Sequence, residues 1–108
     1  MRLSNKEQEK RLEEVLSGYS TLWWKKNKKG RYPVRRDEKK ESKSSLWIRI
    51  TYGKENCNIT TTGDVASDMK VFINKTLGRP GKEARVTHVD WNNVKLNDVK
   101  IILDEFSK

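Results

Sequence analysis

The apolar residues of this chain recur at helical spacing in three stretches, with alternating patterns between them. The clearest helical stripe runs from Val65 to Leu77; Asp64 before it suits an N-cap, and Gly78 suits the position after the end. The last stretch follows Asn97, which also suits an N-cap. The first stretch has a thin apolar face, confined to its last turns. The pattern therefore predicts helices over residues 4–17, 65–77 and 98–106.

Alternation between apolar and polar residues marks the strands. In LWIRITY, residues 46–52, the side chains of Ile48 and Ile50 share one face, and those of Trp47 and Arg49 share the other. A Gly or Asn-rich turn signal separates this strand from the next. Strands are predicted over residues 19–25, 31–36, 46–52, 57–62 and 84–91, the first four as two successive hairpins.

The order of these elements predicts an α+β fold. We expect a small antiparallel sheet, made of two successive hairpins plus one further strand, packed with two to three helices. Residues 1–108 should form a single domain, consisting of an N-terminal helix (1–17), a basic aromatic hairpin (19–36), a flexible linker (37–45) and a ββαβα core (46–108). The expected core residues are Leu46, Ile48, Ile50, Ile59, Val65, Met69, Phe72, Ile73, Leu77, Val86, Ile102, Leu103 and Phe106, with Trp91 close by.

The positive charge of the chain is concentrated in one segment. The formal net charge is +9, and 36% of the residues are charged against 33% hydrophobic. Residues 22–44 contain ten Lys or Arg and three Asp or Glu, a local excess of +7, which leaves only +2 for the rest of the chain. Such an uneven distribution indicates a localised anionic partner.

The stretch TLWWKKNKKGRYPVRR, residues 21–36, contains seven of these basic residues and no acid. Trp23 and Trp24 are adjacent, so on a strand they face opposite sides; we expect one in the core and the other exposed or covered by a basic side chain. Pro33 cannot donate a ladder hydrogen bond, which predicts an edge or irregular strand. Tyr32 could stack on unpaired bases or anchor the hairpin to the core.

The sequence contains no recognisable catalytic or metal-binding pattern. His88 and Asp90 share one strand face, but no nucleophile is identifiable beside them, so a half-buried strand histidine is the simpler interpretation. Cys57 is the only cysteine and fits a small core residue. The glycines of TLGRPGK, residues 76–82, follow a helix and fit a helix stop better than a phosphate loop. We expect no enzymatic activity, no cofactor and no metal.

Three interpretations of the basic segment compete. The first is non-enzymatic binding of DNA or RNA, mainly through the phosphate backbone, by a basic aromatic β-ribbon that could enter a major groove. The second is an inhibitor or adaptor that docks on an acidic or nucleic-acid-binding cleft of a partner protein, as bacteriophage anti-defence proteins do against CRISPR nucleases. The third, peripheral binding to anionic membranes, is the weakest, because the basic stretch does not form a basic amphipathic helix. The purely structural alternative to all three is edge protection by a solvated basic strand. The candidate binding residues are Trp23, Trp24, Lys25, Lys26, Lys28, Lys29, Arg31, Tyr32, Arg35, Arg36 and Arg49.

The remaining sequence features concern the compartment. No apolar run approaches membrane-spanning length, and the basic stretch is not an amphipathic helix, so we expect no membrane partner. The first residues are polar and lack the apolar centre of a signal peptide. A single cysteine fits a reducing compartment. The sequence thus favours a cytoplasmic location.

Overall fold

A computed structural model describes residues 5–36, 44–51, 56–85 and 87–108. The predicted cap at Ser4, the linker residues 37–43, the turn residues 53–55 and the core residue Val86 lie outside these ranges. The elements are α1 (Asn5–Ser17), β1 (Trp23–Trp24), β2 (Arg31–Arg35), β3 (Leu46–Ile50), β4 (Asn56–Thr62), α2 (Asp64–Leu77), β5 (Lys82–Arg85), β6 (His88–Lys95) and α3 (Leu96–Phe106).

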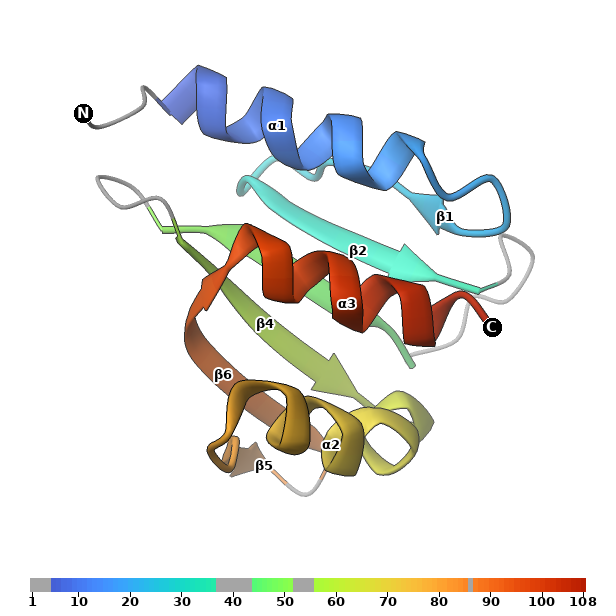
Figure 1. The fold of residues 1–108 in the computed structure, drawn as a ribbon, viewed down its shortest axis with the longest axis vertical. Helices are drawn as coiled ribbons and strands as arrows, with labels where there is room; N and C mark the ends of the chain where they lie inside the picture. Colours follow the sequence, from blue (N-terminus) through green and yellow to red (C-terminus); the bar gives the residue numbers. More distant parts are fainter. Residues whose placement is uncertain (1–4, 37–43, 52–55, 86) are drawn as a thin grey trace.

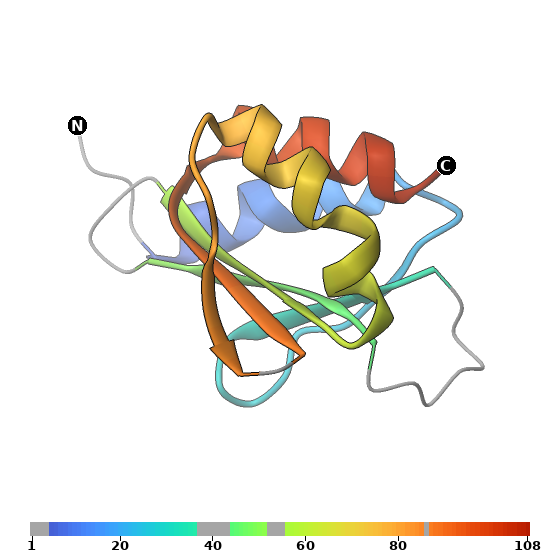
Figure 2. The ribbon, with the colours of Figure 1, turned by 90° about the horizontal axis from the view of Figure 1, so that it is seen from below.

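The six strands form one antiparallel sheet in the order β1-β2-β3-β4-β6-β5, with all three helices on one side of it (Figures 1 and 2). The predicted α+β class is therefore confirmed. The hairpin of residues 19–36 belongs to the same sheet as the other strands, because β2 pairs with β3: Arg31 lies opposite Arg49 at one end, and Val34 lies opposite Leu46 at the other. The other side of the sheet has no helix on it in the part of the chain that the structure describes.

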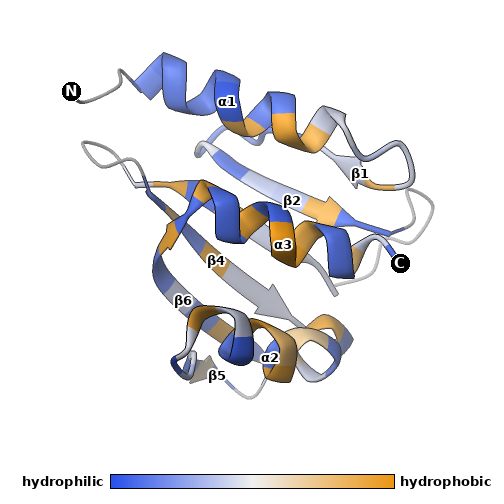
Figure 3. Cartoon of the chain, viewed as in Figure 1, coloured by the Kyte–Doolittle hydropathy of each residue, from blue (hydrophilic) through white to orange (hydrophobic). Residues whose placement is uncertain are grey.

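The core lies between the sheet and the three helices. Most of the predicted core residues are buried there, whereas Phe72 and Leu77 are only partly buried and pack against its rim. The helix α1 is polar in its first turns and apolar in its last turns, where Leu12 and Leu16 enter the core (Figure 3). Cys57 is buried, as predicted. The list of expected core residues lacked several others that are buried: Leu12, Leu16, Leu22, Tyr32, Val34, Ala66, Val89, Val94 and Val99.

The single strand predicted over residues 84–91 is wrong, because the chain forms two antiparallel strands, β5 and β6, in this region. All four residues of β5 are exposed, so this strand has no buried face to produce an alternating pattern. The strand β6 then runs on to Lys95, and α3 begins directly at Leu96. Asn97 therefore lies inside the first turn of α3 and is not its N-cap.

Residues 44 and 45, expected in a flexible linker, are tied to the start of α2. The N-cap of α2 is Gly63 at φ 59°, not Asp64. Glycine has no side chain that could accept a hydrogen bond from the helix, and Ser44 provides the acceptor instead: its Oγ accepts a hydrogen bond from the Asp64 N–H at 3.0 Å. Ser45 is buried and its N–H donates to Thr62 Oγ1 at 3.0 Å. A Cβ at position 63 would lie 2.4 Å from Ser44 Oγ, so this contact requires glycine.

The strand that contains Pro33 is not the outermost strand, contrary to the prediction. β2 lies between β1 and β3. However, β1 pairs only with Val34 and Arg35, so Pro33 is paired with Trp47 of β3 alone among the described residues. The missing N–H of proline therefore falls where β2 has a strand on one side only.

A basic aromatic face on the open side of the sheet

The side of the sheet that faces away from the helices, which we call the open face, carries residues of all six strands. Cross-strand partners place these residues in rows. One row contains Trp47 of β3, Thr60 of β4 and Asp90 of β6. The open face comprises Trp23, Arg31, Arg35, Trp47, Arg49, Asn58, Thr60, Arg85, His88, Asp90 and Asn92, and most of these side chains line one groove of about 690 Å³.

Two arginines of the open face lie directly opposite each other. Arg31 of β2 and Arg49 of β3 are cross-strand partners, both are exposed, and both line the groove. Neither guanidinium forms an ion pair within the described residues. Like charges at opposed positions destabilise a sheet. An anion bound between these two side chains would remove that repulsion.

The four tryptophans have different environments, and Trp47 is the one that the groove exposes. Trp23 and Trp24 face opposite sides as predicted: the guanidinium of Arg35 lies 4.9 Å from the centre of the Trp23 ring, while Trp24 packs on the core side. Trp91 is buried. Trp47 is half-buried on the open face, and in the described part of the chain its ring has neither an aromatic nor a cationic neighbour.

The loop between β1 and β2 adds an ordered set of lysines. Asn27 Oδ1 accepts hydrogen bonds from the N–H groups of Lys29 and Arg31, both at 2.9 Å, and Gly30 has a φ of 74°. Lys25, Lys28 and Lys29 are exposed. The loop lies on the side of the sheet away from the helices (Figure 2). Its charges therefore extend the positive potential of the arginines beyond the edge of the sheet.

Four of the predicted binding residues lie elsewhere. Tyr32 is completely buried and its ring lies 6.1 Å from that of Trp24, so these two rings anchor the hairpin to the core. Lys26 forms an ion pair with Glu9 of α1 at 2.7 Å. On the helix side, Arg36 binds Asp68 at 2.5 Å, donates to the Phe106 carbonyl at 2.9 Å, and lies over the Phe106 ring.

The sequence prediction missed the residues on the floor of the groove. The predicted set lacks five residues of the groove, although each of them is next to a buried residue of its own strand: Trp47, Asn58, Thr60, Asp90 and Asn92. That alternation was a usable signal for Trp47. In β6 the same alternation is hard to detect, because the sequence pattern of residues 84–91 predicts one strand where the chain forms two.

Further titratable groups of the sheet are His88, Asp90 and Cys57. His88 and Asp90 both line the groove, and the His88 imidazole is hydrogen-bonded to Thr87, with 3.3 Å between His88 Nδ1 and Thr87 Oγ1. Cys57 is buried on the opposite side of the sheet, where burial raises the pKa of its thiol to about 11. Within the described ranges, no three His, Cys, Asp or Glu side chains are placed to hold a metal ion.

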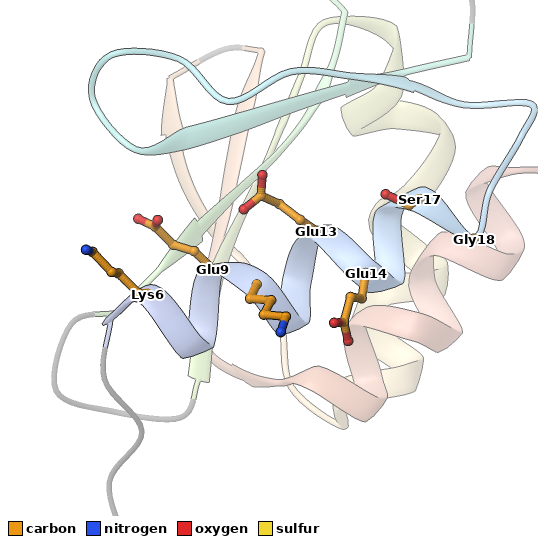
Figure 4. Close-up of a pocket in the computed structure, with 7 residues that line it drawn as sticks. Lys6, Glu9, Glu13, Glu14, Ser17 and Gly18 are labelled. Atoms are coloured by element: carbon orange, nitrogen blue, oxygen red, sulfur yellow. The ribbon is translucent and has the colours of Figure 1, made fainter.

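Two of the other hollows are lined by residues of α1. One follows the outer surface of α1, where Glu13 and Glu14 point to opposite sides of the helix and acidic and basic side chains alternate (Figure 4). The other lies between α1 and α3, where the Tyr19 hydroxyl donates to Asp104 Oδ1 at 2.5 Å and lies 3.1 Å from the Lys100 carbonyl. Burial and this carboxylate raise the pKa of Tyr19 to about 12. Neither hollow gathers charges of one sign.

Comparison of the chain with protein-family models, with curated proteins and with solved structures finds no match. Among the helices in the described ranges, none has the length and apolarity needed to cross a membrane. The class of protein is therefore set by the fold alone, a six-stranded antiparallel sheet with helices on one face. Its function has to be argued from the chemistry of the open face.

Proposed function

We propose that this protein binds nucleic acid through the open face of its sheet and the adjoining lysine loop, without catalysing a reaction. The observation that carries the proposal is the opposed pair Arg31 and Arg49, two exposed guanidinium groups with no carboxylate partner in the described residues. Arginine binds phosphate through two parallel hydrogen bonds, and adjacent phosphates of one strand offer a repeated anion to such a pair.

The surrounding charges support the same substrate. Lys25, Lys28 and Lys29 are exposed on the loop next to these arginines, and Arg85 borders the groove from β5. Each phosphate neutralised by such a residue releases condensed counterions, so binding should be mainly electrostatic and should weaken with salt. The single buried cysteine fits the reducing cytoplasm, which we propose as the location of this activity.

The test is a binding titration of fluorescent single-stranded DNA, single-stranded RNA and duplex DNA over a range of salt concentrations. We compare the natural protein with the double variant Arg31→Gln, Arg49→Gln. Removing two phosphate contacts should weaken binding at low salt by about tenfold or more, and should reduce the slope of log K against log salt by roughly 1.4 to 1.8.

The matched control is the double variant Arg11→Gln, Lys100→Gln, which removes the same charge from exposed positions on α1 and α3. It should retain nearly all of the affinity. Absence of any binding at low salt by the natural protein would falsify the proposal. Equal losses in the two double variants would show that net charge, and not the open face, governs binding.

A second candidate function uses the same surface. The lysine loop lies outside the sheet on the open side, where it could enter the acidic or nucleic-acid-binding cleft of a partner enzyme (Figure 2). The protein would then act as an inhibitor or adaptor of the type that bacteriophages use against host nucleases. Recovery of a stoichiometric protein partner from lysate after nuclease treatment, together with no affinity for free nucleic acid, would favour this alternative.

A further inference from the structure

We propose that the bound nucleic acid is single-stranded, and that one of its bases stacks on Trp47 while the base edge meets Thr60 and Asp90. This inference rests on the proposed function and specifies its substrate. It concerns the middle of the open face, where β3, β4 and β6 lie side by side. Three features carry it: the width of the sheet, the free ring of Trp47, and the separation of charge across the groove.

The width of the sheet argues against duplex binding in a groove. A two-stranded ribbon fits the major groove of DNA, which is about 12 Å wide. The basic hairpin is not such a ribbon, because β1 has two residues and β2 is paired along its other side with β3. The six strands together are about 24 Å across at the usual spacing. The open face can therefore lie against a strand of nucleic acid but cannot enter a duplex groove.

The ring of Trp47 can stack on a base only when that base is unpaired. Its side chain is half-buried in a groove between arginines and polar residues, with no ring or cation neighbour among the described residues. Stacking on aromatic side chains is the common way in which proteins hold single strands, because every base has a π-face. In a duplex the base faces are covered by neighbouring base pairs. Trp47 thus selects for a strand whose bases are accessible.

One side of the groove is purely positive, and the other is mixed in charge. Arg31 and Arg49 lie on the side formed by β2 and β3, whereas on the side of β5 and β6 the carboxylate of Asp90 accompanies Arg85. Asp90 of β6 is in the same row as Trp47 of β3, with Thr60 between them. The carboxylate of Asp90 has no ion-pair or hydrogen-bond partner within the described ranges, although Lys82 is its neighbour on β5. Phosphates should lie over the arginines and avoid Asp90. The base that stacks on Trp47 then projects toward Thr60 and Asp90.

The chemistry of that position indicates which bases fit. A carboxylate accepts hydrogen bonds from the exocyclic amino groups of cytosine, adenine or guanine, whereas thymine and uracil offer on their edge only the single ring N3–H, flanked by two carbonyl oxygens that a carboxylate repels. Asn58, the next open-face residue on β4, uses its Oδ1 to accept from Thr51 Oγ1 at 3.2 Å and from the Asn93 N–H at 3.4 Å. Its amide NH₂ group is then left to donate. The groove thus combines an acceptor, the Asp90 carboxylate, with a donor, the Asn58 amide. A base that carries an amino group next to an acceptor nitrogen or oxygen, such as cytosine, matches both.

The experiment uses short oligonucleotides of equal length: single-stranded poly-dC, poly-dT, poly-rC and poly-rU, and a mixed-sequence duplex. The natural protein should bind poly-dC more tightly than the duplex and several-fold more tightly than poly-dT. Comparison of the affinities for poly-rC and poly-dC shows whether the protein prefers RNA or DNA. Trp47→Leu should weaken poly-dC binding by about tenfold or more, with little change for the duplex.

Two further variants sharpen the result. Trp23→Leu removes an indole from the same face, but one whose ring is already covered by Arg35, so its effect should be clearly smaller than that of Trp47→Leu. Asp90→Asn should bring the ratio of poly-dC to poly-dT affinity close to one, because a carboxamide can also donate to thymine. Thermal unfolding of each variant shows whether the fold is retained.

The outcomes separate the two proposals. If no oligonucleotide binds at low salt, the proposed function fails. If single strands and duplex bind equally well and Trp47→Leu changes neither, nucleic-acid binding stands and the single-strand inference is overturned. An unchanged ratio of poly-dC to poly-dT in Asp90→Asn overturns the assignment of the base edge to this carboxylate.

Discussion

The two faces of one sheet are built from neighbouring residues of the same strands, yet they share almost no chemistry. On the covered face, Ile48, Ile59 and Trp91 form a cross-strand row in which each side chain is buried. One residue away on each of β3, β4 and β6, the open face has Trp47, Thr60 and Asp90. The same backbone therefore presents an apolar layer to the helices and a charged, aromatic layer to solvent.

This difference shows how strictly the strand register is determined. A slip of one residue would exchange the two faces and place Arg49 against the core. The helices require the apolar face for packing, whereas nothing in the described fold requires arginines on the other. The open face is thus the surface on which side chains can be chosen for binding, and changes on the two faces should have opposite consequences.

The largest expected effect is on stability and comes from the covered face. Trp91→Ala removes a buried ring and leaves Asn74 Oδ1 without the indole N–H that donates to it at 3.0 Å. We expect a loss of about 3–5 kcal/mol in the free energy of unfolding. Trp47→Ala removes the same side chain from the open face and should cost about 1 kcal/mol or less. Urea unfolding followed by circular dichroism measures both; equal losses would mean that the open face is also part of the packed core.

A smaller effect distinguishes two arginines of the same hairpin. Arg36 contacts Asp68 and the Phe106 carbonyl on the helix side, so Arg36→Gln should lower the free energy of unfolding by about 1 kcal/mol. The effect should not be larger, because the ion pair is exposed and solvent weakens it. Arg31→Gln should change stability by less than about 0.5 kcal/mol and should instead weaken nucleic-acid binding. Measuring stability and binding for both variants checks this. The prediction fails if Arg31→Gln is the more destabilised protein.

The smallest effect appears only at high pH. The pKa of Tyr19 is raised from 10.0 to about 12, so its contribution to stability is complete below pH 10 and is lost as the pH rises through 12. Tyr19→Phe cannot ionise and should lose less stability over this interval than the natural protein. Titration of Cys57 occurs in both proteins and cancels in the comparison. Denaturant unfolding at pH 9 and pH 11.5 measures the difference; parallel losses would contradict the assignment.

The sequence was sufficient to predict the helices and the strands that have one buried face. The alternation in residues 46–50 and the helical stripe of residues 65–77 each reflect a strong difference in burial, which periodicity detects. The pattern failed where burial does not vary. β5 is exposed at every residue, and β1 has only two residues, so neither could be delimited from the sequence. Strand order was also not readable, because β6 pairs with a strand distant in sequence.

The candidate site was predicted in part for a similar reason. Charge counting located the basic segment with Arg31 and Arg35, because charge is visible in any sequence, and the alternation of residues 46–52 placed Arg49 on the polar face of its strand. It could not show that Arg36 faces the helices or that Tyr32 is buried, since both depend on the register of β2. Apart from Trp47, the floor of the groove was not readable, because it is assembled from β3, β4 and β6, and only the tertiary fold brings Asp90 into one row with Trp47, with Thr60 between them.

The position of β6 between β4 and β5 has a consequence for how the chain reaches this fold. The strands β1 to β4 pair with their sequence neighbours, so they can assemble through short loops. The pairing of Thr62 with His88 closes a loop that contains all of α2 and β5, and the entropy lost on closing a loop rises with its length. Formation of the β4–β6 pair should therefore govern the folding rate. The binding groove, whose floor spans that pair, can exist only after it has formed.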